Sequence, residues 1–265
     1  MCRAGLTSAA HAGSVMSSSI VSAIRRADQI FFELVGEKLT LEHGIAFFDR
    51  DYPQSRQDNV FREVWVEKAE LMPQAWDEVE ACYKSHDLSC HGWVPALGQQ
   101  VDLIEPYLLE RSLHRQSLAA MYVPDWPDLQ TTPGLRVLPA RAMRKAFREL
   151  FESAESAELD ERRLDCPQLD IFVAVIDGKP AGRCSLLQAG EIGNIRDLYV
   201  APEFRRRRVA TSLLVHVLEM SHRLMMRIVC AKVDSQDAAS ITFLEHCGFE
   251  QQGELVEYYT TSRGL

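Results

Sequence analysis

Apolar residues in the second half of the chain follow the periods of a helix and of buried strands. Between residues 209 and 220 they recur every three or four positions, at Val209, Leu213, Val217 and Met220, with Ala210, Leu214 and Leu218 beside them. Residues 225–233 form a nearly continuous apolar run instead, which is typical of a strand covered on both faces of a sheet. The pattern predicts an α/β domain with a central sheet.

Turn signals complete the expected order of elements in this half. Asp177-Gly178 predicts a tight hairpin between two strands, Asp237 is a favourable helix start and Gly248 a favourable helix end. The expected elements are a strand at 135–138, a helix at 140–156 with a charged helix onward to 163, strands at 171–176, 180–187 and 191–200, a helix from 209, a strand at 225–233, a helix from 237 and a last strand.

The first half has weaker patterns. Helices are expected at 20–35, 69–86 and 99–113, an extended segment at 39–48, and strands at 90–94 and 118–123. Residues 122–134 hold three prolines and a glycine and are the clearest linker. We therefore expect a disordered leader at 1–15, with Met16 as an alternative start, an N-terminal α+β domain at 16–130 and a C-terminal domain at 131–265.

Composition narrows the class of protein. Hydrophobic residues make up 46% and charged residues 25% of the chain, and no apolar run approaches the ~20 residues of a membrane span. The cysteines are seven, an odd number without a CxxC spacing, which favours a reduced, cytoplasmic protein without a metal. Residues 1–130 carry 11 basic against 19 acidic residues, so the acidic excess lies in the first half.

Residues 195–214 read as a buried strand, a short turn, four arginines and a helix. A strand that leads directly into a helix directs several free backbone N–H groups, and the positive end of the helix dipole, at one point. Such a point binds phosphate, and adjacent guanidinium groups strengthen the binding. The alternative for four consecutive arginines is a solvated loop or a nucleic-acid contact, which the net charge of −9 opposes.

This segment resembles the acetyl-CoA signature of the GCN5-related N-acetyltransferases, which is Arg or Gln, two residues, Gly, one residue, then Gly or Ala. Arg205 takes the first position and Ala210 the last, and residues 198–204 resemble the family's fourth strand and its exit. Arg208 stands where the family has its central glycine. A strained backbone there would cost on the order of 1–3 kcal/mol, and the side chain must point away or bind phosphate itself.

A second segment, residues 240–249, resembles the closing motif of the same family. Asp237 stands at the family's frequent asparagine, and Leu244 at the tyrosine that protonates the departing thiolate in many members. The resemblance implies a mixed, splayed central sheet of acetyltransferase type. It also implies that the smaller N-terminal domain is a degenerate copy of related fold, as in tandem members, which walls the acceptor cleft or builds a homodimer.

The resemblance also implies the site residues. The backbone of the fourth strand, at its bulge, would polarise the thioester carbonyl, and the arginine loop would hold the pyrophosphate of acetyl-CoA. The expected cofactor contacts are Leu198, Tyr199, Val200, Arg205, Arg206, Arg207, Arg208, Val209, Ala210, Thr211 and Asp237.

Proton transfer needs further groups. Deprotonating an alkylamine at pH 7 costs about 4.6 kcal/mol, and Asp197 or Glu191 could lower that cost as a base. Glu191 is favoured as a strand-end charge, and the alternative for Asp197 is a structural hydrogen bond. Tyr258 or Tyr259 is expected to replace the tyrosine missing at Leu244, with Tyr258 preferred; only one of the two can face the cleft, because strand residues alternate.

The expected function is acetyl transfer from acetyl-CoA directly to a primary amine in a ternary complex. The acidic first half favours a cationic acceptor, a small molecule or a basic peptide. The alternative is a non-catalytic acyl-CoA-binding or regulatory module, since Arg208 and Leu244 both replace residues that the chemistry normally uses. No nucleic-acid or membrane partner is expected.

Overall fold

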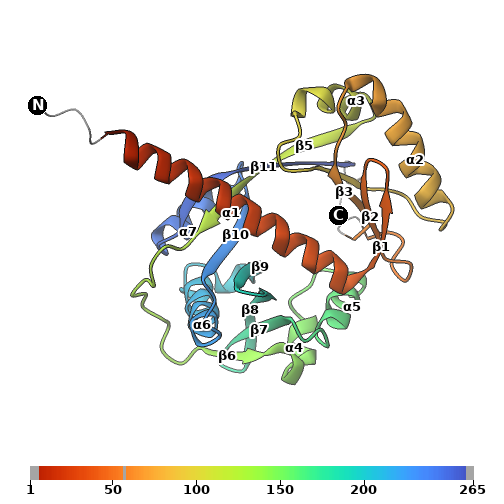
Figure 1. Cartoon of the computed structure of the whole chain (residues 1–265). Coiled ribbons are helices and arrows are strands. Elements are labelled where there is room, and N and C mark those ends of the chain that lie inside the picture. Colours follow the sequence, from red (N-terminus) through yellow and green to blue (C-terminus); the bar gives the residue numbers. More distant parts are fainter. Residues whose placement is uncertain (1–5, 56–57, 261–265) are drawn as a thin grey trace, which may run out of the picture. The chain divides into compact units, whose positions relative to one another are not determined.

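The computed structural model describes residues 6–55 and 58–260, and the side chains of all of these except 6–18 and 154–155. The chain divides into two compact units (Figure 1). The larger unit contains the chain up to Asp28, residues 119–233 and residues 237–253. The smaller unit contains residues 29–118, 234–236 and the chain from Glu254 onward. The sequence predicted a single boundary at 130, whereas four elements, α1, β5, β10 and β11, contribute residues to both units.

The smaller unit is an α+β structure. Its elements are the end of α1 (Leu6–Val35), β1 (Glu37–Leu41), β2 (Gly44–Phe48), β3 (Val60–Val64), the short helix η1 (Ala69–Leu71), α2 (Met72–Lys84), β4 (Gly92–Pro95), η2 (Val101–Leu103), α3 (Glu105–Glu110), the start of β5 (Leu113–Tyr122) and the end of β11 (Glu250–Thr260). The strand order is β1-β2-β3-β4-β11-β5. Its core contains Phe61, Met72, Tyr83, Trp93 and Tyr258.

The larger unit contains the elements that the C-terminal pattern predicted. They are β6 (Arg136–Pro139), η3 (Ala140–Ala142), α4 (Arg144–Arg148), α5 (Ala154–Arg163), β7 (Leu169–Ile176), β8 (Lys179–Ala189), β9 (Ile192–Val200), η4 (Pro202–Phe204), α6 (Val209–Arg223), β10 (Ile228–Asp234) and α7 (Ala238–His246), with the remaining parts of α1, β5 and β11. The expected single helix at 140–156 is wrong. The chain becomes extended at Ser153, whose hydroxyl accepts the Ser156 N–H and begins α5 as a new helix.

The sheet of the larger unit is mixed and splayed, which confirms the predicted fold class. Its strand order is β5-β10-β9-β8-β7-β6, antiparallel from β6 to β9 and parallel between β9 and β10. The parallel pairing runs only from Ile192–Ile228 to Ile195–Ala231. Beyond those pairs β9 continues to Val200 and β10 to Asp234 without pairing to each other.

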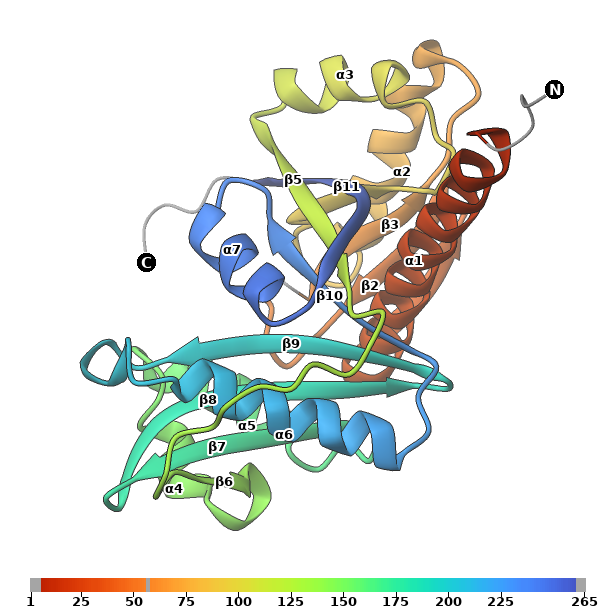
Figure 2. The ribbon, with the colours of Figure 1, turned by 90° about the vertical axis from the view of Figure 1, so that its left-hand side faces the viewer.

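Helix α6 covers one face of this sheet, lying lengthwise along β8 and β9 (Figure 2). A Cβ atom on Gly182 of β8 would lie 3.2 Å from Leu213 and 3.3 Å from Val209, so the absence of a side chain lets α6 approach closely. The predicted apolar stripe is buried except for Met220, which is half-buried, and for Ala210 at the rim. Ser212 and Ser221 share the buried face, because their hydroxyls donate to carbonyls one turn earlier.

A buried ion cluster lies on the opposite face of the sheet, where β9 and β10 separate. Asp28 of α1 is fully buried, and its carboxylate binds the Arg196 guanidinium at 2.9 Å and the Lys232 ammonium at 2.7 Å. Arg196 and Lys232 directly follow Ile195 and Ala231, the last residues that pair the two strands. One carboxylate of α1 therefore bridges both strands at the start of the splay.

The expected leader covers residues 1–15, of which 1–5 lie outside the described residues and 6–15 are the first turns of α1. The cysteines from Cys82 onward are free thiols in the part of the chain that the structure describes. No helix among the described residues is long and apolar enough to cross a membrane.

The Asp28 bridge makes the first testable prediction. Removing one partner of a buried ion pair leaves uncompensated charge, so Asp28→Asn should lower the free energy of unfolding by roughly 3–5 kcal/mol in urea denaturation. Glu219→Gln is the control, because its ion pair with Arg223 is exposed and should change stability by less than about 1 kcal/mol. Equal effects of the two variants would contradict a stabilising role for the bridge.

Candidate functional site

The arginine segment forms a tight loop between β9 and α6. Arg206 and Arg208 have positive φ angles of 62° and 57°, while Arg207 between them does not. Residues of alternating handedness turn successive backbone N–H groups toward one point, an arrangement that binds anions. The loop therefore has the backbone geometry of a phosphate site.

The start of α6 adds to this site. Its first turn contains no acidic residue, and Arg208 at its N-cap makes no side-chain cap. Among the described residues, the N–H groups of residues 206–211 donate to no recorded acceptor. All four arginine side chains are exposed. Free N–H groups, the positive end of a helix of 15 residues and nearby guanidinium groups together favour a bound diphosphate.

The structure settles how Arg208 replaces the glycine of the family pattern. Its backbone is left-handed, with φ 57° and ψ 25°, a conformation that costs a non-glycine residue roughly 1–2 kcal/mol. Its side chain points away from the loop, since Nη1 donates to Oε1 of Gln130 at 3.2 Å. The contact of Arg208 with phosphate stays a prediction.

The end of β9 carries the predicted bulge. Arg183 pairs with Tyr199 but Ser185 pairs with Arg196, so β9 holds one extra residue, and Asp197 there has a φ of 52°. Beyond Ile195, β9 keeps β8 on one edge and has no partner from β10 on the other. Backbone N–H groups of residues 198–200 that face this open edge could bind a carbonyl oxygen.

Asp197 is exposed, and its Oδ2 accepts a weak hydrogen bond of 3.4 Å from the Ser185 hydroxyl. Glu191 lies at the other end of β9, where it pairs with Arg227 at 3.3 Å. Asp237 caps α7, accepting from the Ser240 N–H at 3.0 Å and the Ser240 hydroxyl at 2.6 Å. Of these three carboxylates, Asp197 alone is placed at the bulge.

Sequence reasoning missed a charged cluster beside Asp197. Burial raises the pKa of the Asp160 carboxyl above its ordinary value; the Arg163 guanidinium opposes this shift and the Asp197 carboxylate adds to it. The Arg183 guanidinium lies over the rings of Phe151, at 3.8 Å, and Tyr199, at 4.7 Å, and burial lowers its pKa. Side chains alternate between the two faces along β8, so Arg183 lies on the face opposite α6. This alternation is the feature of the sequence that could have identified Arg183 as a site residue.

The expected general acid is not supported. Tyr258 is fully buried in the core of the smaller unit, and its hydroxyl donates to Oε2 of Glu105 at 2.9 Å. Burial raises the pKa of Tyr258 further above its usual value, and the Glu105 carboxylate adds to that shift. Tyr259 donates to Glu257 at 2.7 Å, and Leu244 is buried on α7. We correct the assignment of Tyr258, because its hydroxyl is occupied within a core.

Comparison with known proteins agrees with this geometry. Residues 140–249 match the model of the acetyltransferase (GNAT) family. These residues form a GNAT acetyltransferase domain. An uncharacterized N-acetyltransferase of Methanocaldococcus jannaschii is 31% identical over 88 residues, which are 31% of this chain and 39% of that protein. The chain therefore spans about two fifths of the length of the curated relative that it matches.

Solved structures share the fold. A GCN5-related N-acetyltransferase from Kribbella flavida has a TM-score of 0.64 at 12% identity, over 92% of this chain and 96% of that one. A functionally unknown conserved protein from Staphylococcus epidermidis has a TM-score of 0.63 at 14% identity, over 86% and 96%. A tandem GNAT protein from the clavulanic acid biosynthesis pathway has a TM-score of 0.53 at 15% identity, over 75% and 74%.

The left-handed backbone at Arg208 predicts a difference between two substitutions that both remove the guanidinium. Arg208→Val should be less stable than Arg208→Gly by roughly 1–2 kcal/mol in urea denaturation, because a β-branched residue strongly disfavours positive φ. Arg205, with φ −63° and ψ 156°, is the matched control, where Val should be at least as stable as Gly. The same ranking at both positions would contradict the strained loop.

The raised pKa of Asp160 predicts a pH dependence of stability. A group whose pKa is higher in the folded state stabilises the fold while it is protonated and loses that contribution as pH rises through the folded pKa. Asp160→Asn should therefore gain stability relative to the wild type as the pH rises above about 4. Asp237→Asn should behave oppositely, losing stability relative to the wild type above about pH 4, because bonds from Ser240 lower the pKa of Asp237.

Proposed function

We propose that this protein transfers an acetyl group from acetyl-CoA directly to a primary amine. The observation that carries the proposal is the continuity of two sites along one strand. The open edge of β9 beyond Ile195 leads through the short η4 into the free N–H groups before α6. A ligand lying along this path would place a diphosphate in the loop and an acyl group beside the bulge at Asp197.

The arginine loop would bind the diphosphate of the coenzyme. The N–H groups of residues 206–211, the helix dipole and the exposed arginines favour an anion of several charges. Amide groups of the coenzyme arm could pair with the open edge of β9 as an added strand would. N–H groups at the bulge would then accept the negative charge that develops on the thioester oxygen.

The chemistry requires a neutral amine. Asp197 is exposed at the bulge and takes the proton of the acceptor ammonium, directly or through a water. The amine nitrogen then bonds to the thioester carbon, the carbon–sulfur bond breaks, and the sulfur leaves as a thiolate. The amide nitrogen loses its second proton to this sulfur, so that the products are an amide, CoA thiol and one proton released to solvent.

The acceptor class follows from charge. At the bulge the Arg163 and Arg183 guanidinium groups offset the Asp160 and Asp197 carboxylates, whereas the first 130 residues carry an excess of acidic over basic side chains. This acidic excess favours a cationic amine.

The second candidate function is a non-catalytic acyl-CoA-binding module, which the buried Leu244 and the occupied Tyr258 hydroxyl favour because neither can protonate a thiolate.

The direct test is calorimetric titration with acetyl-CoA followed by a thiol-release assay over a panel of primary amines. Binding with amine-dependent release of CoA thiol is the expected result. Binding without turnover for any amine would favour the non-catalytic module, and absence of binding would overturn both functions.

Substitution of Asp197 tests the mechanism. Asp197→Asn keeps a residue that tolerates positive φ and should lower kcat by about a hundredfold at neutral pH, the loss typical of a missing general base. Asp177→Asn is the matched control, because Asp177 has a φ of 51° in the hairpin between β7 and β8 and should leave kcat unchanged. Equal rates for both variants would remove Asp197 from the mechanism.

A further inference from the structure

We infer that Gln130 and Thr132, the two ends of the segment 130–132 here called the strap, position the diphosphate-binding loop, and that the Thr132 hydroxyl is the central contact. This inference rests on the proposed function. The strap precedes β6 and lies in the segment that the sequence identified only as a linker. Two of its residues, Gln130 and Thr132, contact the arginine loop and the first turn of α6 within the larger unit.

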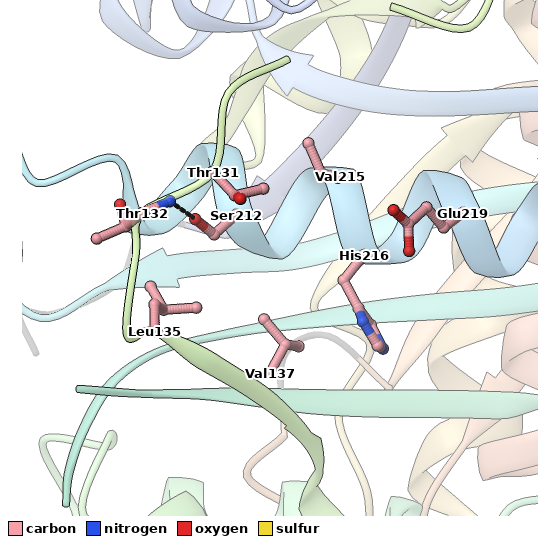
Figure 3. A pocket seen from close by; sticks show the side chains of 8 residues that line it. All are labelled: Thr131, Thr132, Leu135, Val137, Ser212, Val215, His216 and Glu219. Carbon is pink, nitrogen blue, oxygen red and sulfur yellow. Dashed lines mark hydrogen bonds between the residues drawn. The ribbon is translucent and has the colours of Figure 1, made fainter. Parts of the chain in front are cut away.

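The contacts form a connected set. The Thr132 hydroxyl donates to the Arg207 carbonyl at 2.7 Å, and the Thr132 N–H donates to the Ser212 hydroxyl at 3.0 Å. Figure 3 shows the second of these bonds joining Thr132 to α6. The Ser212 hydroxyl in turn donates to the Arg208 carbonyl at 3.0 Å, and Gln130 accepts from the Arg208 side chain. Thr132 thus holds the Arg207 carbonyl directly, and its N–H binds the Ser212 hydroxyl that holds the Arg208 carbonyl.

The bond from Thr132 to the Arg207 carbonyl also fixes the direction of the Arg208 N–H, because both groups belong to one planar peptide. The peptide between Arg207 and Arg208 is trans, so its C=O and its N–H point in opposite directions. Because Thr132 holds the Arg207 carbonyl toward the strap, the Arg208 N–H points away from the strap and into the loop. That N–H is one of the groups that would bind a phosphate oxygen.

The loop needs such support because its backbone is strained. Arg206 and Arg208 both occupy the left-handed region without being glycine, and strain of this kind persists only where neighbouring groups enforce it. A loop free to relax would lose the alternation that makes its N–H groups converge. The strap therefore keeps the loop ready for the ligand before the ligand arrives.

Hydrogen bonds hold the strap in place beside a cavity. This cavity of about 190 Å³ lies between β6 and α6, and its lining includes Thr132, Leu135, Val137, Ser212 and His216 (Figure 3). The linker 122–134, which contains the strap, is fixed near its first residue by a hydrogen bond of 3.1 Å from the Val123 N–H to the Val229 carbonyl of β10. Thr132 is consequently a positioning residue, and its hydroxyl is the group to remove.

The test compares Thr132→Val, which deletes the hydroxyl and keeps the shape, with the wild type. Thr132→Val should weaken acetyl-CoA binding in calorimetry about tenfold and raise KM for acetyl-CoA to match, with kcat and KM for the amine within about twofold. Thr132→Ser restores the donor and should restore affinity. Thr131→Val is the matched control, since Thr131 is the exposed neighbouring threonine and should bind as the wild type does.

A second measurement separates positioning of the diphosphate from a general defect. S-acetylpantetheine lacks the diphosphate, so its kcat/KM as acyl donor should be the same for Thr132→Val and the wild type. An unchanged affinity for acetyl-CoA in Thr132→Val, or an equal loss with S-acetylpantetheine, would overturn the role of the strap. Failure of the wild type itself to bind acetyl-CoA would overturn the proposed function, and the inference with it.

Discussion

The structure of the larger unit depends on the early end of one strand pairing. Parallel hydrogen bonding between β9 and β10 stops at Ile195 and Ala231, and the next residue on each strand binds the same buried carboxylate, Asp28. A buried carboxylate must be paired, and two cations at the splay satisfy it. The bridge holds the two strands together at the start of the splay, while their continuations do not pair with each other. The open edge of β9, on which the proposed chemistry depends, is the consequence.

The binding site then arises from backbone rather than from a constellation of side chains. A diphosphate needs converging donors, and here they are the main-chain N–H groups of a loop whose residues alternate in handedness. Such a loop pays conformational strain at Arg206 and Arg208, and the strap reduces the freedom that would relieve it. Binding, support and strain are thus parts of one local arrangement at the start of α6.

Prediction from sequence succeeded where local signals and tertiary structure agree. The buried stripe of α6, the Asp177-Gly178 hairpin and the helix end at Gly248 follow from periodicity and turn residues, which act over a few positions. Prediction failed where the periodic pattern of a strand or helix is interrupted. Strand β3 was missed because it is short and carries a bulge at Glu63, and the expected helix at 140–156 is interrupted where Ser153 starts a new cap.

By itself the sequence determined the order of elements in the C-terminal half and the position of the arginine loop, because each depends on neighbours along the chain. Only the tertiary structure decided that Asp28 belongs with β9 and β10, that Thr132 holds the Arg207 carbonyl, and that Tyr258 is occupied within a core. These contacts join residues that are 75 to 204 positions apart. No local pattern encodes such a pairing, since it depends on how the whole chain packs.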